Sequence, residues 1–125
     1  MKIKKALLIG AFVVVSIIAL LYGVSPQWFA RTFLNIPQLD PNIAHILRAV
    51  MGLYLALGLF WLFSAFNDKY RNTAVLTTAI FSGGLVIGRI ISCFNEGQPA
   101  PLLTFYIVAE FALTPLAVWV FTLEE

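Results

Sequence analysis

Three ionisable residues lie inside apolar stretches of the sequence: Arg48, Arg89 and Glu110. Charged side chains at membrane depth are costly and rare, so each of them marks a candidate functional site. Arginine can extend its long stem toward the membrane surface, whereas glutamate reaches less far. Glu110 must therefore be protonated, face water or pair with a cation. We predict that the three side chains meet, and that two arginines against one glutamate leave a positive charge for a carboxylate or phosphate.

Other polar side chains are expected at a similar depth: His45, Ser92, Asn95 and Tyr106. They could add hydrogen bonds around the same ligand. A structural role is equally well supported, because a buried ion pair can serve only to fix the register of two helices. His45 is expected to be an interfacial residue and Cys93 a small core residue. Since no Ser-His-Asp or Cys-His spacing is readable, no catalytic residue is predicted, and an enzyme is the weakest of the function classes.

The composition is that of a membrane protein. Of 125 residues, 61% are hydrophobic and only 11% are charged, whereas a soluble domain carries about 25% charged residues. The net charge of +2 is too small to suggest nucleic-acid binding. One cysteine excludes an internal disulfide, and one histidine excludes an internal bis-histidine haem site. No metal or cofactor is predicted.

Four apolar runs predict four membrane-spanning helices. They cover approximately residues 6–24, 42–66, 73–94 and 102–123. The first run follows basic residues but is longer than the roughly 7–15 apolar residues of a signal peptide, and no A-x-A-like cleavage site follows it. We therefore predict that the first run is retained, and that residues 1–125 form a single domain, an all-α integral membrane four-helix bundle.

The connection at residues 25–41 is the longest. Ser25 followed by Pro26 is typical of a helix start. The mixture of aromatic and polar residues that follows suits a short helix lying in the membrane interface, with an ordered loop as the open alternative. Asp40 and Pro41 repeat the same start signal before the second run.

Small residues predict where helices approach one another. Gly52 and Ala56 share a helix face with His45 and Arg48, and small residues on a face let a neighbouring helix come close. Residues 84–88 form a G-x-x-x-G pattern, which permits a close helix crossing and is also common by chance.

The basic residues predict the orientation. Of the basic residues outside the apolar runs, five fall on one side of the membrane and one, Arg31, falls on the other. The five are Lys2, Lys4, Lys5, Lys69 and Arg71. Basic residues favour the cytoplasmic side, so both termini are predicted to be cytoplasmic in a multi-pass protein of the bacterial inner membrane.

Several of these residues also carry a resemblance. Residues 48–55 (RAVMGLYL), Trp61, residues 88–99 (GRIISCFNEGQP) and Glu110 resemble the bacterial membrane proteins grouped as domain of unknown function 4345. The resemblance extends over approximately residues 22–121, and the group is broadly similar to DoxX-like proteins. It implies a four-span architecture and importance for Arg48, Arg89 and Glu110, but no established activity.

Two functional hypotheses remain beside the enzyme. In the first, the protein binds a small anionic or amphipathic ligand, such as a lipid or a small acid, in a cleft that opens to the outer leaflet. In the second, it is an accessory or structural subunit of a respiratory or quinone-linked membrane complex, and the charged cluster is a structural ion pair. Membrane lipids are the expected surroundings, and a homo-oligomer or another membrane protein is an open possibility as partner.

Overall fold

The computed structural model describes residues 2–123, with side chains from residue 3 onward. This part of the chain forms five helices: α1 (Lys2–Gly23), α2 (Pro26–Phe33), α3 (Pro41–Ala65), α4 (Asp68–Glu96) and α5 (Pro101–Phe121). All but α2 are long and apolar enough to cross a membrane. The predicted all-α bundle with four membrane-spanning helices is therefore confirmed. Met1, Glu124, Glu125 and the side chain of Lys2 entered the predictions but lie outside the described residues.

The helix starts follow the signals in the sequence. The Ser25 hydroxyl accepts a hydrogen bond from the backbone N–H of Trp28 at 3.3 Å, and α2 begins at the following proline. The Asp40 carboxylate accepts one from the N–H of Asn42 at 2.8 Å at the start of α3. Each cap satisfies a backbone donor that the helix itself leaves unpaired. The connection at residues 25–41 thus contains the short helix rather than only a loop.

The start of α4 differs from the expected boundary. The helix begins at Asp68, several residues before the apolar run, because Asn67 caps it and accepts a hydrogen bond from Lys69 at 3.0 Å. Arg71 contacts Asp68 at 2.5 Å and donates to the carbonyl of Ala65 near the end of α3. Residues 68–72, which lie between two of the predicted spans, therefore form the first turns of the helix.

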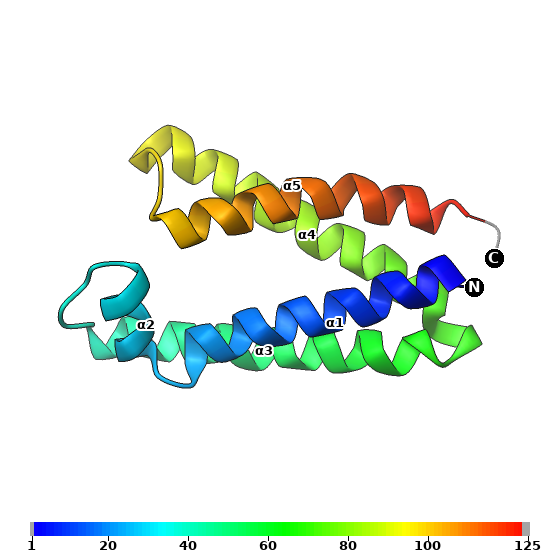
Figure 1. Ribbon diagram of the computed structural model, residues 1–125, viewed down its shortest axis with the longest axis horizontal. Coiled ribbons are helices and arrows are strands. Elements are labelled where there is room, and N and C mark those ends of the chain that lie inside the picture. The colour runs from blue at the N-terminus through cyan, green and yellow to red at the C-terminus, as the bar shows by residue number, and fades with distance from the viewer. Residues whose placement is uncertain (1, 124–125) are drawn as a thin grey trace.

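The four long helices form two pairs, with α1 packed along α3 and α4 along α5 (Figure 1). The start of α1 and the α3–α4 connection lie at one end of the bundle, and α2 and the α4–α5 connection lie at the other, which we call the α2 end (Figure 1). Hydrogen bonds link the pairs, as between Arg71 and Ala65 above. Trp61 Nε1 donates to Thr77 Oγ1 at 3.1 Å, and Lys4 Nζ donates to Asn72 Oδ1 at 2.7 Å.

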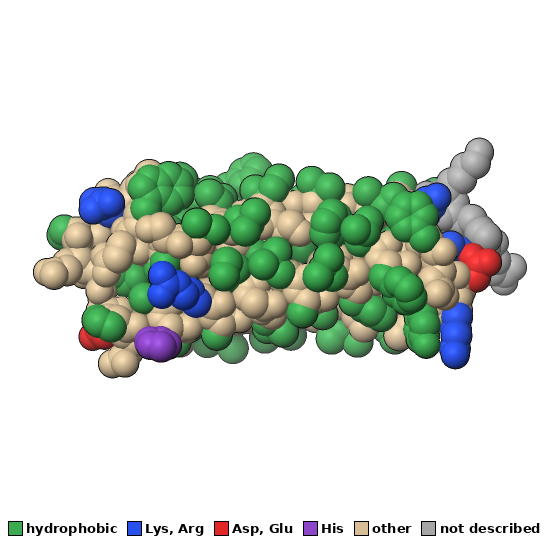
Figure 2. All heavy atoms as spheres, turned by 90° about the horizontal axis from the view of Figure 1, so that it is seen from below, with side chains coloured by type: hydrophobic (Ala, Val, Ile, Leu, Met, Phe, Trp, Pro, Cys, Tyr) green, Lys and Arg blue, Asp and Glu red, His purple; other side chains and the backbone are tan. Residues whose placement is uncertain are grey.

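The outer surface matches a lipid environment. Figure 2 shows hydrophobic side chains along the whole length of one face, with Lys and Arg side chains toward the two ends. Many large apolar side chains are exposed, including Ile80 at 65% and Phe94 at 87%. Lipid can solvate such a surface, whereas water cannot do so cheaply.

The closest helix contacts involve glycines other than the predicted ones. A Cβ on Gly23 would lie 2.4 Å from Cβ of Met51, and a Cβ on Gly58 would lie 2.9 Å from Cγ1 of Val15. Both glycines therefore let α1 and α3 pack tightly. A Cβ on Gly84 would meet nothing within 4 Å among the described residues. The same holds for Gly52 and Gly88, so the predicted close crossings at these positions do not occur within the described chain.

Candidate functional site

Arg89 and Glu110 meet inside the bundle, as predicted. Arg89 Nε lies 3.5 Å from Glu110 Oε2, and the two side chains are only 22% and 12% exposed. The pair joins α4 to α5. At this distance the contact is an ion pair rather than a well-formed hydrogen bond, and Glu110 Oε2 has no hydrogen-bond partner in the described part of the chain. The carboxylate therefore keeps an unused acceptor at this point.

Arg48 does not join them, and the prediction that the three residues meet is wrong. Its side chain is exposed on α3, and no ion pair links it to Glu110 among the described residues. Tyr54 is the α3 residue that faces the site. Relative to Tyr54, Arg48 lies roughly 9 Å nearer the α2 end and about 240° around the helix axis. The surplus positive charge expected at the site is therefore absent from it.

The remaining predicted residues divide in the same way. Tyr106 is buried beside the pair, one helical turn from Glu110 on α5. His45, Ser92 and Asn95 are exposed and make no hydrogen bond to the pair among the described residues. Cys93, expected in the core, is exposed as well.

Tyr22 holds the site together, although it is not among the residues predicted for the site. Its ring lies edge-on to Phe29 of α2, Tyr54 of α3 and Tyr106 of α5, with centroids 4.9, 6.2 and 6.0 Å away. Its hydroxyl also interacts with the guanidinium of Arg89 on α4. One side chain of α1 thus contacts all four other helices. The sequence contains one signal for this role of Tyr22: it lies near the end of the first apolar run, level with the predicted cluster.

A cleft of about 530 Å³ lies between the α1–α3 and α4–α5 pairs. Its lining residues come from four helices and are Ala6, Leu7, Gly10, Ala11, Val14, Val15, Ile18, Tyr22, Tyr54, Trp61, Phe81, Ser82, Leu85, Tyr106, Ala109, Glu110, Ala112, Leu113 and Leu116. Most of these side chains are apolar. A volume of about 300–1,000 Å³ with few polar groups is typical of small-molecule sites.

The cleft is polar at one end and apolar at the other. Tyr22, Tyr106 and Glu110 line it toward the α2 end, and Ala6 and Leu116 line it toward the opposite end. On α1 the lining runs from Ala6 to Tyr22, roughly 24 Å along the helix axis at about 1.5 Å per residue. This distance is most of the thickness of a bilayer core. The cleft therefore has the length and the polarity gradient of an amphipathic molecule.

The cleft opens sideways between α1 and α5. Its lining residues Gly10 and Val14 on α1 and Ala109 on α5 are exposed, whereas Trp61 and Ser82 on α3 and α4 are buried. The buried residues form the floor and the exposed ones form the rim. The rim thus lies on two helices that are long and apolar enough to cross a membrane.

Comparison with known proteins supports the architecture without adding a chemistry. The family described as a domain of unknown function, DUF4345, matches residues 3–121. The chain belongs to the DUF4345 family. Neither a curated protein nor a solved structure matches it. The match confirms the family resemblance carried by the Arg48 and Arg89 segments, and the candidate site of this DUF4345 protein must be argued from its own geometry.

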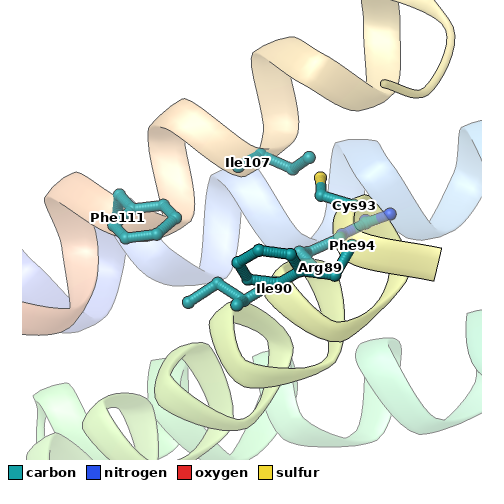
Figure 3. Close-up of a pocket in the computed structure, with 6 residues that line it drawn as sticks. All are labelled: Arg89, Ile90, Cys93, Phe94, Ile107 and Phe111. Atoms are coloured by element: carbon teal, nitrogen blue, oxygen red, sulfur yellow. The ribbon is translucent and has the colours of Figure 1, made fainter. Parts of the chain in front are cut away.

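The DUF4345 chain has a second, smaller hollow between α4 and α5, which we call the α4–α5 groove. It has a volume of about 240 Å³ and is lined by Arg89, Ile90, Cys93, Phe94, Ile107 and Phe111 (Figure 3). It shares no lining residue with the cleft. Arg89 thus lines the groove while its partner Glu110 lines the cleft, so the ion pair lies between the two hollows.

Proposed function

We propose that this protein takes up a small amphipathic molecule from the lipid phase and holds it in the cleft. The observation that carries the proposal is an apolar cleft of about 530 Å³ that is open between α1 and α5 and has Glu110 in its polar end. An ionisable residue inside a membrane domain is by default a functional candidate, and this one faces a cavity of ligand size.

The position of Arg48 bears on the kind of ligand. Two arginines facing one glutamate would leave a positive charge at the site for a small free acid. With Arg48 exposed elsewhere on α3, the charges of Arg89 and Glu110 balance each other at the site. The apolar length of the cleft then favours an amphipathic ligand over a small anion.

The cellular location belongs to the same proposal. Lys4, Lys5 and Lys69 lie at the end of the bundle opposite α2. The positive-inside rule would place this end in the cytoplasm of a bacterial inner membrane. The polar end of the cleft then lies in the outer half of the bilayer, from which the ligand enters.

Native mass spectrometry of the detergent-purified protein tests the proposal. We expect a bound small molecule on the wild type that is largely lost from Gly10→Phe, because Gly10 lines the cleft and an added side chain there has open space to enter it. Gly84→Phe is the matched control, since Gly84 also has open space around it but does not line the cleft. This variant should keep the molecule.

Equal retention in the wild type and both variants would contradict binding in the cleft. The opposing hypothesis is an accessory subunit of a membrane complex. Under this hypothesis a partner protein should co-purify with the wild type and with both variants. No small molecule should be lost on the Gly10→Phe substitution.

A further inference from the structure

Two buried polar atoms at the polar end of the cleft lack hydrogen-bond partners. Glu110 Oε2 and the Tyr106 hydroxyl have no hydrogen bond within the described part of the chain, and Tyr106 is only 5% exposed. Both residues line the cleft. They are four positions apart on α5 and therefore lie on the same helix face, one turn from each other. Buried polar groups without hydrogen-bond partners are uncommon, so each one calls for an explanation, and a ligand that binds in the cleft is one.

The charge around these atoms restricts the ligand that can complete them. Arg89 already balances Glu110. A carboxylate or phosphate placed here would bring a second negative charge next to Glu110, and a cationic head would compete with Arg89 for the same carboxylate. A neutral group avoids both costs.

A hydroxyl can form a hydrogen bond with each of these two atoms. It is one donor and also an acceptor, so it can donate to Glu110 Oε2 while it accepts from the Tyr106 hydroxyl. A carbonyl or an ether oxygen could accept from Tyr106 but would leave Glu110 Oε2 unpaired. The pair of atoms therefore selects for a head group that carries a donor.

The shape of the cleft indicates how the rest of the ligand lies. Beyond Tyr22 the lining of α1 is apolar as far as Ala6, and Trp61 forms part of the floor in this region. The phosphate of an ordinary phospholipid is disfavoured by the charge argument. A molecule with a small neutral head and an extended hydrocarbon chain fits the cleft, with the head at the polar end and the chain at the apolar end.

Resting on the proposed function, we infer that the ligand is a single-chain amphiphile with a neutral, hydroxyl-bearing head. The head lies between Glu110 and Tyr106, and the chain lies along α1 toward Trp61. The ion pair with Arg89 holds the Glu110 carboxylate in place, so that it can accept a hydrogen bond from the hydroxyl of the head group.

Three probes with one chain length separate the head-group chemistries: 16-bromohexadecan-1-ol, its methyl ether and 16-bromohexadecanoate. Bromine quenches tryptophan fluorescence at short range, and Trp61 lines the cleft. Replacing the exposed Trp28 and Trp119 with phenylalanine leaves Trp61 as the reporter. We expect the alcohol to bind about tenfold more tightly than the ether or the carboxylate, as one hydrogen bond to a charged acceptor allows.

Variants at the head-group position test the two contacts. Glu110→Gln should weaken binding of the alcohol severalfold and leave binding of the ether nearly unchanged, because only the alcohol donates to this carboxylate. Tyr106→Phe should weaken binding of both, because either oxygen can accept from the Tyr106 hydroxyl. Unchanged ether binding also shows that the Glu110→Gln variant is folded. Tyr70→Phe, an exposed tyrosine outside the cleft, should alter neither.

The failures of the two proposals are distinguishable. Equal binding of all three probes would overturn the hydroxyl head group while leaving the cleft as a binding site. If no probe quenches Trp61 and Gly10→Phe loses no native ligand, the proposed function itself fails.

Discussion

Arg89 Nε and Glu110 Oε2 lie 3.5 Å apart, and this pair ties α4 to α5 at the polar end of the cleft. Each residue also lines a different hollow, Glu110 the cleft and Arg89 the α4–α5 groove (Figure 3). Loss of either charge leaves the other uncompensated in a largely apolar setting. The pair is therefore both a structural link and the polar end of the candidate site.

The first prediction concerns the energy of this pair. Glu110→Gln should lower the free energy of unfolding by about 3 kcal/mol, near the lower end of the range for broken buried pairs because Arg89 remains partly exposed. Adding Arg89→Gln should recover part of the loss, since it removes the uncompensated cation. Denaturant unfolding in mixed detergent micelles measures both values.

Arg48→Gln provides the control for this double-mutant cycle. Because Arg48 is exposed and apart from the pair, its effect should add to that of Glu110→Gln without recovery. Recovery by Arg48→Gln equal to that by Arg89→Gln would mean that all three residues are coupled, against the arrangement described above.

The depth of the charged residues was predictable, but the direction in which each one points was not. Arg48, Arg89 and Glu110 were placed inside apolar runs and predicted to meet, and two of them do meet. A helix turns by about 100° per residue, so residues at one depth can face opposite ways. An apolar run surrounded by lipid has little amphipathic pattern to fix that direction. For α3 it is fixed by which residues pack against α1, and these include Gly58 and Tyr54.

The second prediction concerns Tyr22, whose ring packs against three aromatic rings on three other helices. Tyr22→Ala should destabilise the protein by about 3 kcal/mol, as expected when a large buried side chain is removed and a cavity remains. Tyr22→Phe keeps the ring contacts and removes only the hydroxyl next to Arg89, so its cost should be about 1 kcal/mol. Thermal unfolding in detergent distinguishes the two.

Tyr70→Ala is the matched control, because Tyr70 is 38% exposed near the start of α4. Its effect should stay within about 0.5 kcal/mol, as for most exposed positions. If Tyr22→Ala costs no more than Tyr70→Ala, Tyr22 does not organise the site.

The glycines show a second limit of the sequence. The G-x-x-x-G pattern of α4 has open space around it, while Gly23 and Gly58, which belong to no such pattern, carry the tight α1–α3 contact. Whether a glycine faces another helix or lipid depends on the partner helix, and composition does not identify that partner. The cap signals, in contrast, depend on neighbouring residues alone, and those at Ser25 and Asp40 were predictable.

The third prediction follows from that contrast. Gly58→Ala should cost about 1–3 kcal/mol, because the new Cβ would lie 2.9 Å from Val15 Cγ1 and a β-branched side chain in a helix has little freedom to move away. Gly84→Ala should be neutral or stabilising by up to about 1 kcal/mol, since alanine favours the helix and meets no neighbour. Equal effects of the two substitutions on thermal stability would contradict the tight α1–α3 packing.

The last prediction concerns orientation: Lys69 should face the cytoplasm and Gln98 the periplasm. The two residues are exposed, one near the start of α4 and the other in the α4–α5 connection, so they lie at opposite ends of the bundle. The basic residues concentrate at the Lys69 end, and such residues are retained on the cytoplasmic side during insertion. A Cys93→Ala background removes the natural thiol, and a cysteine is then introduced at each position in turn. On intact cells an impermeant thiol reagent should label the cysteine at position 98 and not the one at position 69, and both should react once the membrane is permeabilised. The reverse pattern would place the polar end of the cleft in the inner half of the bilayer, and ligand entry from the outer leaflet would then be wrong.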